Sequence, residues 1–119
     1  MTSPEEAYEK LAIYVLTFIG DRKWDSAGCE IRIFSKMASG SQWLSYKGIR
    51  DEKGDFEDNP NAIWDGLDAA IFLRDDLLQN NEQRIWGLFF TLYPDGKFNI
   101  EYDYNKPEDY EETEDTIIV

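Results

Sequence analysis

The residues of this chain that could do chemistry are almost all carboxylates. The sequence contains 25 Asp and Glu residues, no histidine and one cysteine, Cys29. The absence of histidine removes the commonest general base and the commonest neutral metal ligand. A nucleophilic cysteine needs such a base beside it, so we expect Cys29 to be a small buried residue in a strand. These residue types disfavour most enzyme classes and provide no ordinary zinc site.

Two groups of carboxylates could still form a reactive or metal-binding site. Glu101 and Asp103 are expected on the polar face of one strand, where two carboxylates at a suitable separation could hydrolyse a glycoside. Residues 51–58 are rich in oxygen ligands but lack the order of an EF-hand calcium loop. Neither expected helix follows a Gly-rich phosphate-binding loop. We therefore interpret both groups as solvated surface acids and predict no metal and no cofactor.

The net charge of the chain is strongly negative. Twelve Lys and Arg residues leave a formal charge of −13 over 119 residues. Such a protein repels nucleic acid and anionic membranes and attracts basic surfaces. The longest apolar stretch, residues 11–19, is too short to span a bilayer, and residues 1–10 lack the basic region of a secretory signal. We expect a cytoplasmic protein that binds a basic protein partner, and no nucleic acid, membrane or small-molecule substrate.

The first half of the chain predicts a helix followed by a hairpin. Ser3 and Glu6 form a capping box, and apolar residues then recur with a helical period, which predicts a helix over residues 4–19 that Gly20 ends. Beyond this helix the apolar positions alternate, as in a strand with one solvated face. Turn residues interrupt the alternation, so we expect residues 28–49 to form one hairpin.

The second half of the chain repeats this order. A second helix is predicted over about residues 61–79, capped by Asn59 or Asn61. Its apolar stripe contains Ile63, Trp64, Leu67, Ala70, Ile71, Arg74, Leu77 and Leu78. A nearly continuous apolar run, residues 85–93, precedes a Pro-Asp-Gly turn and an alternating strand, which predicts a second hairpin. The order αββαββ predicts an α+β fold with a four-stranded antiparallel sheet and two helices packed on one face.

We predict one α+β domain over residues 1–105 and an acidic, solvated tail over residues 106–119. The tail contains six carboxylates and one cation, Lys106, and like charges at that density resist compaction. Within the domain, the odd and the even positions of residues 85–93 are both apolar, so both sides of this strand carry apolar side chains. One aromatic face of the sheet should therefore lie outside the helical layer. Exposed rings among carboxylates are typical of a protein-binding surface.

The second hairpin resembles that of a known family. Trp86, the Gly96-Lys97-Phe98 sequence and the Tyr102-Asp103-Tyr104 sequence are similar to the hairpin of YezG-like immunity proteins. The order and length of the upstream elements agree with this family over roughly residues 5–105, whereas the acidic tail departs from it. The resemblance implies an immunity protein that protects the producing cell from a secreted polymorphic or contact-dependent toxin, often a nuclease.

The charge and the resemblance together predict the residues that bind the toxin. A nuclease that binds phosphates presents Lys and Arg, and an acidic inhibitor can complement that charge pattern. The carboxylates expected to pair with those cations are Asp51, Glu52, Asp55, Glu57, Asp58, Asp65, Asp68, Asp75, Asp76, Glu101 and Asp103. The rings expected to act as anchors are Trp43, Tyr46 and Tyr104.

Two other functions are compatible with the sequence. An acidic adaptor or chaperone-like module would bind a basic host protein or secretion partner, and it would need no toxin gene beside its own. A carboxylate-based hydrolase would use Glu101 or Asp103 in a cleft that raises the pKa of one of them. Gene neighbourhood and a test for turnover separate these functions from the immunity function.

Overall fold

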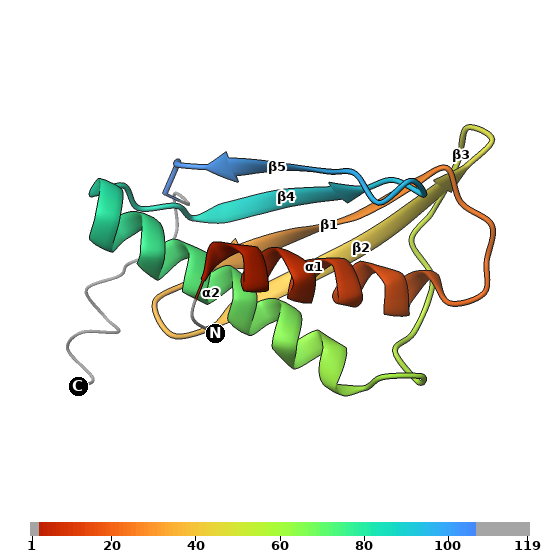
Figure 1. Cartoon of the computed structure of the whole chain (residues 1–119), viewed down its shortest axis with the longest axis horizontal. Coiled ribbons are helices and arrows are strands. Elements are labelled where there is room, and N and C mark those ends of the chain that lie inside the picture. The colour runs from red at the N-terminus through yellow and green to blue at the C-terminus, as the bar shows by residue number, and fades with distance from the viewer. Residues whose placement is uncertain (1–2, 107–119) are drawn as a thin grey trace.

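The computed structural model describes residues 3–106, which form two helices and a five-stranded antiparallel sheet (Figure 1). The elements are α1 (Pro4–Ile19), β1 (Ser26–Ile33), β2 (Ala38–Tyr46), β3 (Ile49–Asp51), α2 (Asn61–Asn81), β4 (Gly87–Leu92) and β5 (Phe98–Asp103). The predicted α+β class is confirmed, whereas the predicted count of four strands is wrong by one. The predicted tail lies outside the described residues, apart from Lys106.

The fifth strand arises from a tight turn inside the segment that was expected to form one returning strand. Lys47 and Gly48 have φ angles of 51° and 81°. Positive φ at two consecutive residues is typical of a two-residue hairpin loop. The chain therefore reverses after Tyr46, and Ile49 pairs back with Tyr46 at the edge of the sheet.

The ends of α1 agree with the sequence, but those of α2 differ. The Glu6 N–H donates to Ser3 Oγ at 3.3 Å, and Gly20 ends α1 with a φ of 61°. Helix α2 has Pro60 at its N-cap with no side-chain cap, so the expected asparagine cap is wrong. It also ends two residues later than predicted, at Asn81, where Glu82 adopts a left-handed conformation.

The sheet joins the two hairpins through its central strand. The strand order is β3-β2-β1-β4-β5. Strand β1 pairs with β2 on one side and with β4 on the other, so that Cys29 is opposite both Gln42 and Phe90. Because all pairings are antiparallel, side chains at paired positions point to the same face and form rows across the sheet.

Both helices pack on one face of this sheet, and the core lies between the two layers. Helix α1 packs on β1, β2 and β4, while α2 packs on β1 and β2. The core contains Cys29, Ile31, Leu88 and Phe90 from the sheet, each at most 1 % exposed. Within residues 3–106, no helix covers the opposite face (Figure 1). Neither described helix is long and apolar enough to cross a membrane.

Candidate functional site

The uncovered face of the sheet carries three rows of side chains, which the strand register aligns. Reading from β2 towards β5, the rows are Trp43–Gly28–Thr91–Asn99, Ser41–Glu30–Phe89–Glu101 and Ser39–Arg32–Gly87–Asp103. Two of the three rows contain a glycine, at which the row has no side chain. The neighbouring side chains can lean over these gaps, so each glycine shapes the surface.

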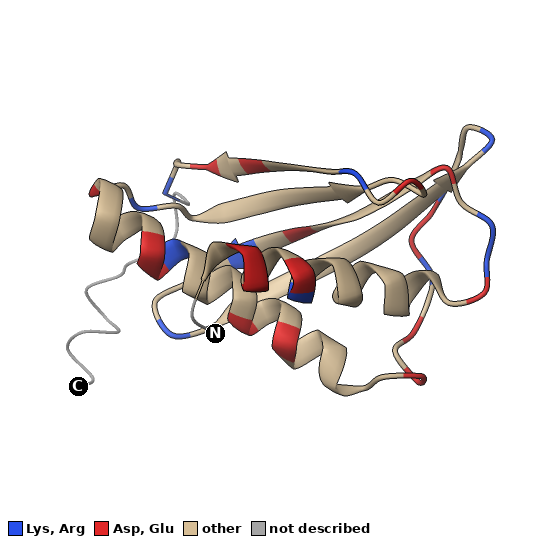
Figure 2. Cartoon of the chain, viewed as in Figure 1, with Lys and Arg blue, Asp and Glu red and all other residues tan. Residues whose placement is uncertain are grey.

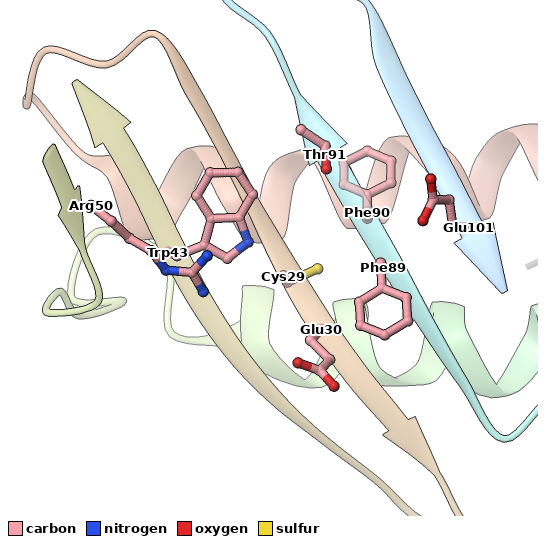
Figure 3. A pocket seen from close by; sticks show the side chains of 8 residues that line it. All are labelled: Cys29, Glu30, Trp43, Arg50, Phe89, Phe90, Thr91 and Glu101. Atoms are coloured by element: carbon pink, nitrogen blue, oxygen red, sulfur yellow. The ribbon is translucent and has the colours of Figure 1, made fainter. Parts of the chain in front are cut away.

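A hollow opens on this face beside Gly28. A Cβ atom on Gly28 would lie 2.2 Å from the Phe90 carbonyl oxygen and 3.0 Å from the Trp43 ring, so this ring lies over the glycine. The hollow has a volume of about 280 Å³ and is flanked by Trp43 and Phe89 (Figure 3). Its lining residues are Cys29, Glu30, Trp43, Arg50, Phe89, Phe90, Thr91 and Glu101.

Most charges around the hollow are paired within the protein. Arg32 Nη2 lies 2.9 Å from Glu30 Oε1, and Arg32 Nη1 lies 2.7 Å from Asp103 Oδ2. The Arg32–Asp103 pair spans Gly87, where a Cβ would approach Arg32 Nη1 to 3.4 Å. Arg50 stacks on the Trp43 ring at 4.9 Å. The uncovered face is therefore nearly neutral, despite the acidity of the chain.

The pKa values of two groups on the sheet disfavour catalysis there. The backbone N–H of Asn105 and the Arg32 guanidinium lower the pKa of Asp103. A carboxyl group that acts as a general acid needs a raised pKa, whereas the pKa of Asp103 is lowered. Burial raises the pKa of the Cys29 thiol to about 12. Cys29 is 1 % exposed, so the prediction that it is a buried strand residue is confirmed.

The outer layer of helices is the anionic part of the described structure. Figure 2 shows carboxylates along both helices and along the loop that precedes α2. The helices carry seven of them, namely Glu5, Glu6 and Glu9 of α1 and Asp65, Asp68, Asp75 and Asp76 of α2. The cations of these helices are Lys10 and Arg74, and Arg74 is only 6 % exposed. The potential over this layer must therefore be negative.

Exposed apolar side chains lie within the same layer. Trp64 is 67 % exposed, although the sequence placed it on the apolar stripe of the second helix; that prediction is wrong because α2 packs through small residues instead. Ile13 and Leu16 of α1 are 41 % and 48 % exposed. Gly66 of α2 lies against the Tyr14 ring of α1, so the half of α1 with Ile13 and Leu16 lies beside the half of α2 with Trp64.

The acidic loop at residues 51–58 uses some of its carboxylates for its own structure. Asp51 binds Arg22 at 3.3 Å and accepts from the Lys53 N–H at 2.9 Å. Asp55 accepts from the Glu57 N–H at 3.2 Å. Among residues 3–106, no three His, Cys, Asp or Glu side chains converge to hold a metal ion. The loop is thus an acidic surface segment tied to α1 through Arg22.

The structure divides the predicted binding residues between two opposite faces. The four carboxylates of α2 belong to the helical layer, whereas Trp43, Glu101 and Asp103 lie on the uncovered face of the sheet. Tyr46 is half-buried and lies on the same side of β2 as the buried Leu44. Tyr104 is 50 % exposed just beyond β5. The predicted binding residues therefore do not form one continuous surface in the described structure.

Several residues at these surfaces were missed from the sequence. Glu30 and Phe89 flank the hollow; the alternation in β1 placed Glu30 away from the helices, whereas the continuous apolar run of β4 gave no side for Phe89, which only its pairing with Glu30 decides. Trp64, Glu5 and Glu9 add to the helical layer, but a helical period cannot say which part of a stripe a second helix leaves uncovered. The structure instead buries small residues outside the predicted stripe, Ala62, Gly66 and Ala69, and leaves Trp64 exposed.

Comparison with known protein families adds an independent observation. Residues 5–119, nearly the whole chain, match the family described as "Immunity protein YezG-like". A comparison with curated proteins found no match.

Proposed function

The chain belongs to the YezG-like immunity protein family, and from this premise we propose that it binds and neutralises a toxin of the producing cell without catalysing a reaction. The toxin domain is basic and is a nuclease from a polymorphic or contact-dependent toxin. Binding takes place in the cytoplasm, where the toxin would otherwise reach the nucleic acid of its own cell. No cofactor takes part.

The observation that supports this proposal is the asymmetry of charge between the two faces. The helical layer carries seven carboxylates and two cations, of which Arg74 is buried and Lys10 is half-buried, whereas the uncovered face of the sheet pairs most of its carboxylates with Arg32. A domain that binds phosphate backbones presents clustered Lys and Arg. We propose that this cluster docks on the helical layer and on the adjoining loop at residues 51–58.

Trp64 supplies an anchor for such an interface. It is 67 % exposed, and Asp68 follows one helical turn later on the same face of α2. Exposed tryptophan is among the residues most enriched at binding hot spots. Carboxylates around an anchor of this kind set the orientation and raise the association rate, from ~10⁵–10⁶ M⁻¹s⁻¹ for neutral partners to about 10⁸ M⁻¹s⁻¹ at low salt.

The direct test is to purify the protein with the product of its neighbouring gene and to assay nuclease activity with and without it. We expect a stable complex in which nuclease activity is lost, and no turnover by the immunity protein alone.

The affinity for the toxin should fall steeply between about 0.05 and 0.5 M salt, because surface charges are screened. Affinity that does not change with salt would refute the electrostatic part. Capture of a basic protein that is not a toxin would favour the adaptor function.

A matched pair of charge reversals tests which face binds. Asp68→Lys on the helical layer and Glu101→Lys on the sheet change the net charge equally. We expect Asp68→Lys to weaken toxin binding about ten-fold or more and Glu101→Lys to weaken it about two-fold at most. If Glu101→Lys weakens toxin binding more than Asp68→Lys does, the toxin binds at the hollow on the sheet.

A further inference from the structure

An apolar cleft lies at the edge of the sheet, on the side of the helices. The main contacts of α1 with the sheet are to β1, β2 and β4 and those of α2 are to β1 and β2, whereas α1 reaches β5 through the Tyr8 ring, which contacts Phe98. The first half of α1 and the β4–β5 hairpin therefore leave a cleft of about 480 Å³ between them. This volume falls in the range of about 300–1,000 Å³ that is typical of ligand clefts. Its lining residues are Glu5, Tyr8, Glu9, Ala12, Leu92, Gly96 and Phe98.

The apolar wall of the cleft is held in place before any partner binds. The Phe98 ring stacks on Phe90 at a centroid distance of 5.3 Å and contacts the Tyr8 ring at 5.4 Å. Phe98 is nevertheless 43 % exposed, whereas Phe90 is 1 % exposed. Contacts with rings on two sides restrict the Phe98 ring to one orientation. Binding of a partner against Phe98 therefore costs little side-chain entropy.

The charged residues that line the cleft have one sign. Glu5 and Glu9 are the charged lining residues, and they lie one helical turn apart on α1. No Lys or Arg lines this cleft within the described part of the chain. An anionic ligand would meet both carboxylates, whereas a cationic group beside an apolar group would satisfy both parts of the cleft.

We propose that the cleft receives an apolar side chain of the toxin, of leucine or phenylalanine type, that has Lys or Arg beside it. The apolar group packs on Phe98 and Leu92, and the neighbouring cation pairs with Glu5 or Glu9. This inference rests on the proposed function. It deepens it because Glu5 and Glu9 also belong to the anionic helical layer, so a single basic domain can contact that layer and insert its anchor here.

The chemistry of the cleft is tested with capped dipeptides and amide NMR spectra of the full chain. N-acetyl-Phe-Arg-amide should shift the signals of Ala12, Gly96 and Phe98 and bind about five-fold more tightly than Phe-Glu or Gly-Arg analogues. Ala12→Leu places three more carbons, Cγ and two Cδ, in the cleft and should abolish the shifts at Gly96 and Phe98. Ala12→Ser, a matched control of smaller volume, should retain them. Unshifted cleft signals, or equal binding of all three dipeptides, would overturn the proposal.

The same two variants separate this inference from the proposed function when the neighbouring toxin is the ligand. We expect Ala12→Leu to weaken toxin binding about ten-fold and Ala12→Ser about two-fold at most, with unchanged unfolding midpoints. If Asp68→Lys weakens binding but Ala12→Leu does not, the cleft proposal fails and the proposed function stands. If the wild-type protein binds no toxin, the proposed function fails together with this choice of occupant. A dimer that Ala12→Leu dissociates would assign the cleft to a second copy of the chain and overturn the proposal.

Discussion

Arg74 shows how one charged residue is used inside a very acidic protein. It is 6 % exposed and donates to the carbonyl oxygens of Phe34 at 2.8 Å and Ser35 at 3.0 Å. Its Nε lies 2.6 Å from Asp75 Oδ1. The guanidinium therefore ties α2 to the segment that follows β1, and its role is structural.

Replacing this group should destabilise the fold. We expect Arg74→Met to lower the free energy of unfolding by about 2–3 kcal/mol, because charge-assisted hydrogen bonds to two carbonyls are lost. Arg74→Lys should recover only part of this loss, since one ammonium cannot donate in the geometry of a guanidinium. Urea unfolding measures both variants, and Lys10→Met serves as the surface control, with an expected change within about 0.5 kcal/mol. A loss as small as that of the control would contradict the structural role of Arg74.

The pair formed by Arg32 and Asp103 predicts a dependence of stability on pH. The pKa of Asp103 is lowered in the folded state, so its contribution is present above the ordinary carboxyl pKa and is lost as pH falls through the folded value. Asp103→Asn should therefore reduce stability by about 0.5–1 kcal/mol at neutral pH. This difference from the wild type should shrink between about pH 5 and pH 2. If urea unfolding gives a difference that stays constant over this pH range, the charge of Asp103 does not contribute to stability.

At the scale of elements, the contact between the two helices depends on a glycine. A Cβ on Gly66 would lie 2.3, 2.8 and 2.9 Å from three atoms of Tyr14. Two of these atoms, Cγ and Cβ, are near the backbone of α1, and Tyr14 is 1 % exposed. A methyl group at position 66 would therefore press on a buried side chain close to the backbone of α1.

This contact predicts that Gly66→Ala is destabilising in spite of the higher helix propensity of alanine. The propensity gain is about 1 kcal/mol, whereas overpacking a closed contact costs about 1–3 kcal/mol or more. We expect a net loss of about 1–2 kcal/mol in the free energy of unfolding. Gln79→Ala, on an exposed part of the same helix, should change stability by less than about 0.5 kcal/mol. Stabilisation by Gly66→Ala would mean that the helices do not approach as closely as described.

At the scale of the whole molecule, charge and stability should be separable. Residues 107–119 contain six carboxylates and no Lys or Arg, so removing them leaves a formal charge of −7. All core residues of the described structure lie between Ala7 and Tyr102. We expect truncation after Lys106 to change the free energy of unfolding by less than about 0.5 kcal/mol.

The same truncation should slow association with the basic toxin at low salt. Long-range steering depends on the net charge, so the rate constant should fall several-fold while the dissociation rate changes little. Stopped-flow mixing at low and high salt measures both rates, and the difference between the two chains should vanish at about 1 M salt, where the Debye length is about 3 Å. A large rise in the dissociation rate would instead show that the tail contacts the toxin.

Much of the fold followed from local patterns. Ser3 and Gly20 bounded α1 where expected, and the alternation in β1 placed Cys29 and Ile31 in the core. The sign of the charge and the family-like hairpin were also evident without a structure. These features depend on residues close together in the chain, for which helical and strand periods state directly which side chains share a face.

Only the tertiary structure decided which of the many carboxylates share a surface. Pairing of β1 with β4 brought Glu30 and Phe89 together, although 59 positions separate them in the sequence. The fifth strand depended on positive φ angles at Lys47 and Gly48, and the exposure of Trp64 depended on how closely α1 approaches Gly66. Strand register and helix placement are set by packing between distant segments, so local periodicity could supply the charge of the binding surfaces but not their location.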